Sequence, residues 1–159
     1  MADELNLVKA LEVYNTLLTM MDKKGWHYTK IEEKLMIESG VKTEDIPVSF
    51  YVVVNPRNEV VQFLSKLPFD VPEDKRIDLA IAVCVANYQL VDGCFDYDCR
   101  DGSLIFRLTS SYRGSQLSED VFEYMIYCAA STVDAFNDKF FLLAKGELTL
   151  QQFMEMHKN

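Results

Sequence analysis

A strand-rich segment around a proline turn constrains the fold of this chain more than any other feature. VSFYVVV at residues 48–54 is rich in β-branched and aromatic residues, and the turn NPRN separates it from EVVQFLSKL at residues 59–67. Pro56 suits the first central position of such a turn. The sequence therefore predicts a β-hairpin. Because apolar residues occupy both faces of its first strand, we expect that strand to lie centrally in an antiparallel sheet.

A second segment, GCFDYDCRDGSLIFR at residues 93–107, spaces its acids like the start of a calcium-binding loop. Such a loop needs oxygen ligands at positions 1, 3 and 5, glycine at position 6 and an acid at position 12. Counted from Asp96, positions 5 and 12 are Arg100 and Arg107, and the glycine comes one residue late. The alternative is a hairpin with Asp101-Gly102 as a two-residue turn. We therefore expect a turn here and no metal site.

A two-residue turn would fix the register of this second hairpin. It predicts an apolar face made of three facing pairs: Cys99 with Leu104, Tyr97 with Phe106, and Phe95 with Leu108. On the other face Asp96 would lie opposite Arg107, and Asp98 would lie diagonal to the same arginine. Cys94 and Cys99 would point to opposite faces, because five positions separate them along one strand. They are therefore not expected to share a disulfide or a metal.

Four helices are predicted from apolar periodicity and end signals. The first covers about residues 3–23, with an apolar stripe of Leu7, Ala10, Leu11, Tyr14, Leu17, Leu18 and Met21. The second covers residues 74–88, behind a proline that suits the first turn. Ser118 is a typical N-cap for a long third helix that ends near Ala144, with Gly146 as its stop. Its predicted apolar stripe consists of Phe122, Met125, Ile126, Ala129, Val133, Phe136 and Phe140. Thr149 begins a capping box for a short fourth helix.

Together these elements predict a single α+β domain over residues 1–159. Residues 34–39 alternate weakly and predict an edge strand. The sheet then has about five antiparallel strands in the order α-β-β-β-α-β-β-α, followed by the short C-terminal helix.

The charge of the chain limits its partners and its location. Sixteen basic and twenty-five acidic side chains give a net charge of −9. This charge repels phosphate backbones and anionic lipid, so we expect neither nucleic acid nor a membrane as a partner. The N-terminus lacks the pattern of a signal peptide. The four cysteines form no CxxC pair, which favours a reduced, cytoplasmic protein.

The motifs that usually mark enzymes are not found in the sequence. It contains no GxSxG, P-loop, HExxH or glycine-rich dinucleotide motif. His27 is expected to be a loop or strand-edge residue, although it is a possible general base. His157 lies too close to the chain end to be expected as a ligand. We therefore expect a non-enzymatic protein without a cofactor or metal.

Several short motifs form a set between residues 67 and 107. They are Leu67-Pro68 before Val71-Pro72-Glu73, Asn87, Gly93-x-Phe95, and Asp101-Gly102 before Ile105-Phe106-Arg107. With the flanking hairpin and long helix, about residues 26–145 resemble the YbjN-type family of small bacterial proteins. Members are labelled sensory transduction regulators and grouped with type III secretion chaperone-like folds. The helical extension at residues 147–157 departs from that pattern.

The resemblance implies an antiparallel sheet with packed helices, usually in a dimer. Chaperones of this shape are non-catalytic and hold an extended partner segment on apolar surface. The motifs themselves are structural, and we expect Asn87 to form hydrogen bonds near the end of its helix. The role of chaperone-like or regulatory adaptor, with a protein or peptide client, rests on this analogy of fold. The alternative is a small-ligand or weakly catalytic domain with a pocket between sheet and helices.

Two apolar surfaces are candidate interfaces. The helix at residues 74–88 has one stripe of Ile77, Ile81, Cys84 and Tyr88 and another of Leu79, Val83 and Ala86. In one alternative, one stripe packs on the sheet and the other packs on a second copy in a homodimer. In the other alternative, helices of the same chain cover both stripes. The second candidate consists of Tyr51, Val53, Val61 and Phe63. These residues would form either a peptide-binding face or the interior of the sheet.

Overall fold

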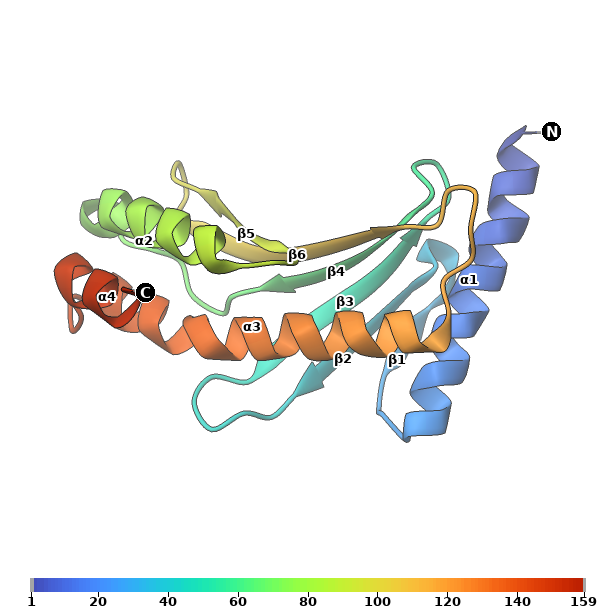
Figure 1. Ribbon diagram of the computed structural model, residues 1–159, viewed down its shortest axis with the longest axis horizontal. Helices are drawn as coiled ribbons and strands as arrows, with labels where there is room; N and C mark the ends of the chain where they lie inside the picture. The colour runs from blue at the N-terminus through green and yellow to red at the C-terminus, as the bar shows by residue number, and fades with distance from the viewer. Residues whose placement is uncertain (1, 159) are drawn as a thin grey trace.

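The computed structural model describes residues 2–158, with side chains from Asn6 onwards, and shows one antiparallel sheet with helices packed against it (Figure 1). The helices are α1 (Ala2–Lys24), α2 (Arg76–Gln89), α3 (Glu119–Lys145) and α4 (Leu150–Met156). The strands are β1 (Thr29–Ile31), β2 (Met36–Val41), β3 (Val48–Asn55), β4 (Val60–Lys66), β5 (Cys94–Asp98) and β6 (Ser103–Ser111). Their order across the sheet is β1-β2-β3-β4-β6-β5, and the predicted α+β class is confirmed.

The sheet has six strands rather than the five predicted. β1 contains only three residues, too few for an alternating pattern to be visible in the sequence, and it pairs with β2. β2 therefore lies between β1 and β3, and the prediction of an edge strand at residues 34–39 is wrong. The first hairpin is confirmed, and β3 lies inside the sheet between β2 and β4.

One face of the sheet forms the core of the protein. Val52 lies opposite Phe63 and Val54 opposite Val61, and all four side chains are almost fully buried. Alternate residues such as Tyr51 point to the other face and are exposed. The helices lie on the buried face: α3 runs along the sheet, with α1 at one end and α2 and α4 at the other (Figure 1).

The long helix α3 has the ends and the buried stripe that its sequence predicts. The Val121 N–H donates to the Ser118 side chain at the N-terminus, and Gly146 adopts a left-handed conformation at the C-terminus. The whole predicted stripe is buried, namely Phe122, Met125, Ile126, Ala129, Val133, Phe136 and Phe140. The capping box of α4 at Thr149 is also formed.

The buried stripe of α1 is rotated relative to the prediction. Leu7 and Leu11 are exposed, and the buried positions are Ala10, Val13, Tyr14, Leu17, Met20 and Met21. The Tyr14 hydroxyl donates to the Met36 carbonyl at 3.1 Å, which turns this side of the helix toward the sheet. The helix itself was predicted, but a sequence with apolar residues on several sides does not fix which side packs.

The register of the second hairpin is shifted by two residues. Tyr97 pairs with Leu104 and Phe95 pairs with Phe106, so the predicted pairs are wrong although the same side chains share a face. The turn is longer than two residues because the Asp98 carbonyl and carboxylate accept the N–H groups of Gly102 and Arg100 at 2.8 and 2.9 Å. Cys99 is consequently an exposed turn residue and has no strand partner.

Gly102 provides a test of how tightly this turn packs. Its φ is +83°, and a Cβ atom there would lie 2.3 Å from the Val71 carbonyl oxygen. We expect Gly102→Ala to lower the free energy of unfolding by about 2–4 kcal/mol, since left-handed strain and overlap with backbone add together.

Gly114→Ala is the matched control, because Gly114 has φ +69° and no atom within 4 Å of a Cβ. It should cost about 1 kcal/mol from backbone strain alone. Urea unfolding of both variants measures the difference. Equal losses would show that the turn does not pack against Val71 as described.

Candidate protein-binding surface

Helix α2 carries two of the most exposed large apolar side chains among the described residues. The stripe predicted from Leu79, Val83 and Ala86 is buried, together with Ala82. The outer stripe, which we define as Ile77, Ile81, Cys84 and Tyr88, is exposed, with Ile77 at 77% and Tyr88 at 90% of their full accessible surface. Of the two alternatives, cover of both stripes by helices of the same chain is therefore excluded.

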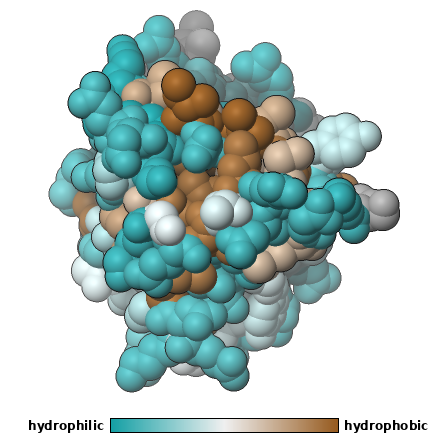
Figure 2. Space-filling view, turned by 90° about the vertical axis from the view of Figure 1, so that its left-hand side faces the viewer, coloured by the Kyte–Doolittle hydropathy of each residue, from teal (hydrophilic) through white to brown (hydrophobic). Residues whose placement is uncertain are grey.

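The outer stripe belongs to a wider apolar area at this end of the molecule. Figure 2 shows hydrophobic side chains in a patch across the end where α2 and α4 lie, surrounded by hydrophilic ones. Val91, just beyond α2, is 96% exposed. A shallow hollow in this area is lined by Glu73, Arg76, Ile77, Ala80, Ile81, Cys84, Val85 and Cys99. Apolar area of this kind on a protein surface is typical of an interaction site.

The C-terminal end of α2 is fixed to the sheet by one side chain. The Phe95 N–H donates to Asn87 Oδ1 at 2.8 Å, and Asn87 Nδ2 donates to the Phe95 carbonyl at 3.0 Å. The expected structural role of Asn87 is thus confirmed. Because β5 is the last strand of the sheet, the amide also occupies two backbone groups that another strand would otherwise pair with.

The N-terminal end of α2 is fixed by Arg76. Its guanidinium group donates to the carbonyl oxygens of Arg100 at 2.7 Å, Val71 at 3.3 Å and Asp101 at 3.4 Å. The Val71 N–H also donates to the Gly102 carbonyl at 2.9 Å. The turn between β5 and β6 therefore holds the segment that leads into α2, and the helix cannot rotate without breaking contacts at both ends.

The acidic cluster before Gly102 shapes this turn. The Asp96 carboxylate accepts a hydrogen bond from Arg107 at 2.7 Å, which lowers the pKa of Asp96. Hydrogen bonds from Arg100 lower the pKa of Asp98 to about 2. The Ser103 N–H lowers the pKa of Asp101 by donating to its carboxylate. Each acid thus has a local donor as its partner, although Asp98 pairs with Arg100 rather than lying near Arg107 as predicted.

The four residues proposed as one peptide-binding face do not share a face. Val61 and Phe63 are buried beneath the helices, whereas Tyr51 and Val53 lie on the open face. The four-residue connection between β3 and β4 pairs even-numbered with odd-numbered positions, so Val61 and Phe63 share the face of Val54 and Val52. The open face instead combines Tyr51 and Val53 with Leu64 of β4 and the exposed Ile105 of β6.

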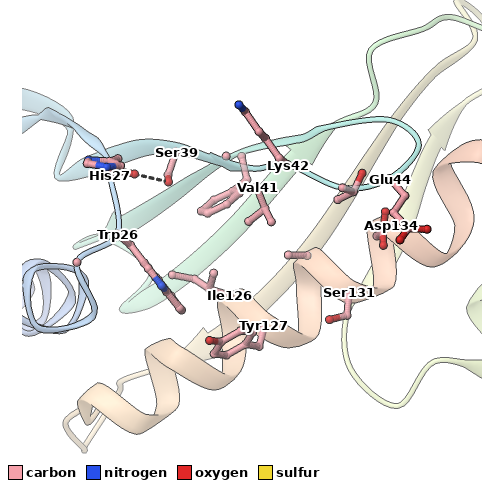
Figure 3. Close-up of a pocket in the computed structure, with 15 residues that line it drawn as sticks. Trp26, His27, Ser39, Val41, Lys42, Glu44, Ile126, Tyr127, Ser131 and Asp134 are labelled. Carbon is pink, nitrogen blue, oxygen red and sulfur yellow. Dashed lines mark hydrogen bonds between the residues drawn. The ribbon is translucent and has the colours of Figure 1, made fainter.

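A separate cleft of about 960 Å³ lies between the β2–β3 region of the sheet and α3 (Figure 3). Trp26 and Tyr127 lie at one end and Glu44 and Asp134 at the other. This confirms the existence, although not the use, of a pocket between sheet and helices. The acidic end is not predicted by the sequence, in which only His27 is a candidate site residue near the cleft, because the walls come from segments far apart in the chain.

His157 differs from its predicted state. The ring stacks on Phe153 at 4.3 Å and on Phe136 at 5.3 Å between centroids, and Nδ1 lies 2.7 Å from the Phe153 carbonyl oxygen. It is therefore part of the packing of α4 and not a frayed terminal residue. Among the side chains that the structure describes, from Asn6 to Lys158, no three His, Cys, Asp or Glu residues come together as a metal site would require.

Comparison with protein families decides the classification of this fold. The model of the family YbjN, described as "Putative bacterial sensory transduction regulator", matches residues 14–142. The chain belongs to the YbjN family. The match includes every motif of the set between residues 67 and 107, and it ends in the last turn of α3, so α4 lies outside it. No sequence match to a curated protein was found.

Two solved structures show the same fold at low sequence identity. One is YbjN from E. coli, titled a "putative transcription regulator", at a TM-score of 0.57 and 10% identity, covering 84% of this chain and 92% of that one. The other is the ExsC–ExsE complex, at a TM-score of 0.55 and 14% identity, covering 80% of this chain and 94% of that one. The fold is thus type III secretion chaperone-like. The family description and the name of the first structure both refer to regulators.

Within the described residues, no helix has both the length and the apolarity that a membrane crossing requires.

Proposed function

We propose that this protein is a non-enzymatic adaptor, chaperone-like or regulatory, that works as a homodimer in the cytoplasm and binds a protein or peptide client. The observation that carries the proposal is the exposed outer stripe of α2 on a helix that is fixed at both ends. The four free cysteines suit a reducing compartment.

The outer stripe favours a second copy as its occupant. In a two-fold dimer each residue is used twice, so one stripe on each copy makes a self-complementary interface. Burial of a full Ile side chain contributes about 1.5–3 kcal/mol, and Ile77 and Ile81 would be buried on both copies. The hollow beside Ile81 and Cys84 gives the facing side chains a place to pack.

The open face of the sheet is the proposed client surface. Tyr51, Val53, Leu64 and Ile105 form its apolar part, and it lies opposite the helices. An extended segment can lie across such a face with alternate side chains on the apolar residues. Support comes from the ExsC–ExsE complex, in which a protein of this fold is bound to another protein.

Crosslinking through the native thiol of Cys84 tests the dimer. A chain with Cys94, Cys99 and Cys128 changed to Ser retains only Cys84, in the middle of the outer stripe. Helices packed across a two-fold axis lie about 8–10 Å apart, close enough for residues near the axis to form a disulfide. We expect mild oxidation to give a disulfide-linked dimer on a non-reducing gel.

The matched control is a chain without native cysteines that carries Ser115→Cys, since Ser115 is exposed on the β6–α3 connection. It should crosslink only slowly, through random collision. If the Cys84 chain forms no more dimer than this control, the proposed interface is wrong.

Affinity capture from an extract of the source cell tests the client surface. We expect Tyr51→Asp to abolish recovery of the client, because a charge on the open face must be desolvated when the client binds. Ser115→Asp adds the same charge at an exposed site away from this face and should leave recovery unchanged. Equal recovery with both variants would remove the open face from the proposal.

A further inference from the structure

The cleft between the sheet and α3 has the size of a small-molecule site. Its volume of about 960 Å³ lies at the upper end of the range of about 300–1,000 Å³ that is usual for such sites. It is bounded by the segment after α1, by the connection between β2 and β3, and by α3 (Figure 3). It includes neither the outer stripe of α2 nor the apolar part of the open face.

The walls of the cleft are held in place by hydrogen bonds. Asn137 is 1% exposed, and its Nδ2 donates to the Ile46 carbonyl at 2.9 Å. The Thr43 hydroxyl donates to the same carbonyl at 2.9 Å, so the β2–β3 connection is tied to α3. Ser39 donates to the His27 carbonyl at 2.7 Å and ties the segment after α1 to β2. The cleft is therefore formed before any ligand binds.

One end of the cleft is aromatic and apolar. Trp26 and Tyr127 meet edge to face, with centroids 5.2 Å apart. Phe50 and Ile126 contribute to the same lining. A flat aromatic or an aliphatic group suits this end. Such a group gives up no hydrogen bond when it leaves water and enters the cleft.

The other end of the cleft is acidic. Glu44 and Asp134 both line this end in Figure 3, and neither takes part in an ion pair with a described residue. Lys42 is the basic residue of the lining, and its side chain points away from α3. Two unpaired carboxylates at one end of an apolar cleft attract a cation and repel an anion, and the net charge of −9 acts in the same direction.

We propose that this cleft binds an organic cation whose aromatic or aliphatic body lies against Trp26 and Tyr127 and whose amine or guanidinium group lies between Glu44 and Asp134. From Ile126 to Asp134, α3 rises about 12 Å at about 1.5 Å per residue, so a molecule with four or five single bonds between ring and charge fits the cleft. The proposal is independent of the adaptor role, since it uses other residues.

Three small probes that share a phenyl ring and a short alkyl chain and carry head groups of different charge test the proposal. They are 4-phenylbutylamine, 4-phenylbutanol and 4-phenylbutyrate, which are cationic, neutral and anionic at pH 7. Trp26 is the single tryptophan of the chain, so its fluorescence reports binding directly. We expect the amine to bind about threefold to tenfold more tightly than the alcohol, and the butyrate to bind more weakly than both.

The double variant Glu44→Gln, Asp134→Asn should bring the amine and the alcohol to within about twofold of each other. Glu12→Gln removes one exposed charge on α1 and should leave the preference unchanged. Thermal unfolding of each variant with and without probe provides a second readout that does not depend on Trp26.

The proposal is overturned if the wild-type protein binds amine and alcohol equally, or if the double variant keeps the full preference. It is also overturned if neither fluorescence nor thermal unfolding responds to millimolar amine. Capture of a peptide on this cleft without any response to the amine would assign the site to protein binding instead.

Discussion

The fixed position of α2 is the constraint on which the account of this protein depends. Asn87 joins one end of the helix to the backbone of β5, and Arg76 joins the other end to the β5–β6 turn. At Phe95, which is buried, a backbone group left unpaired would be costly, and at the turn three carbonyl oxygens accept from one guanidinium group. A helix with apolar residues on two sides could otherwise rotate to hide its larger ones. Here the smaller side is held inside, and Ile77 and Tyr88 stay outside.

The family motifs describe this attachment more than any chemistry. Gly93 and Gly102 both have positive φ, and a Cβ on either would overlap with Phe106 or Val71. Asn87 connects the helix to the residue two positions beyond Gly93, and Gly102 contacts the segment that leads into Arg76. The motifs between residues 67 and 107 therefore position one helix on the sheet.

Much of this architecture follows from local sequence. Caps at Ser118 and Thr149, the proline turn and the periodic stripe of α3 depend on residues close together in the chain. The failures involve registers and distant contacts. The β5–β6 turn is set by hydrogen bonds of Asp98 that compete with the two-residue turn. Which side of α2 is covered, and the cleft beside Trp26, depend on contacts between distant segments. Sequence periodicity contains no information on them.

The mass of the protein in solution tests the central claim most directly. Sedimentation equilibrium at micromolar concentration should give about twice the chain mass of 18.3 kDa for the wild-type protein and for Val8→Asp, which alters an exposed apolar residue of α1. Ile81→Asp, in the outer stripe, should give a mass close to 18.3 kDa with unchanged secondary structure. A wild-type protein that remains at the mass of one chain throughout this range would contradict the account.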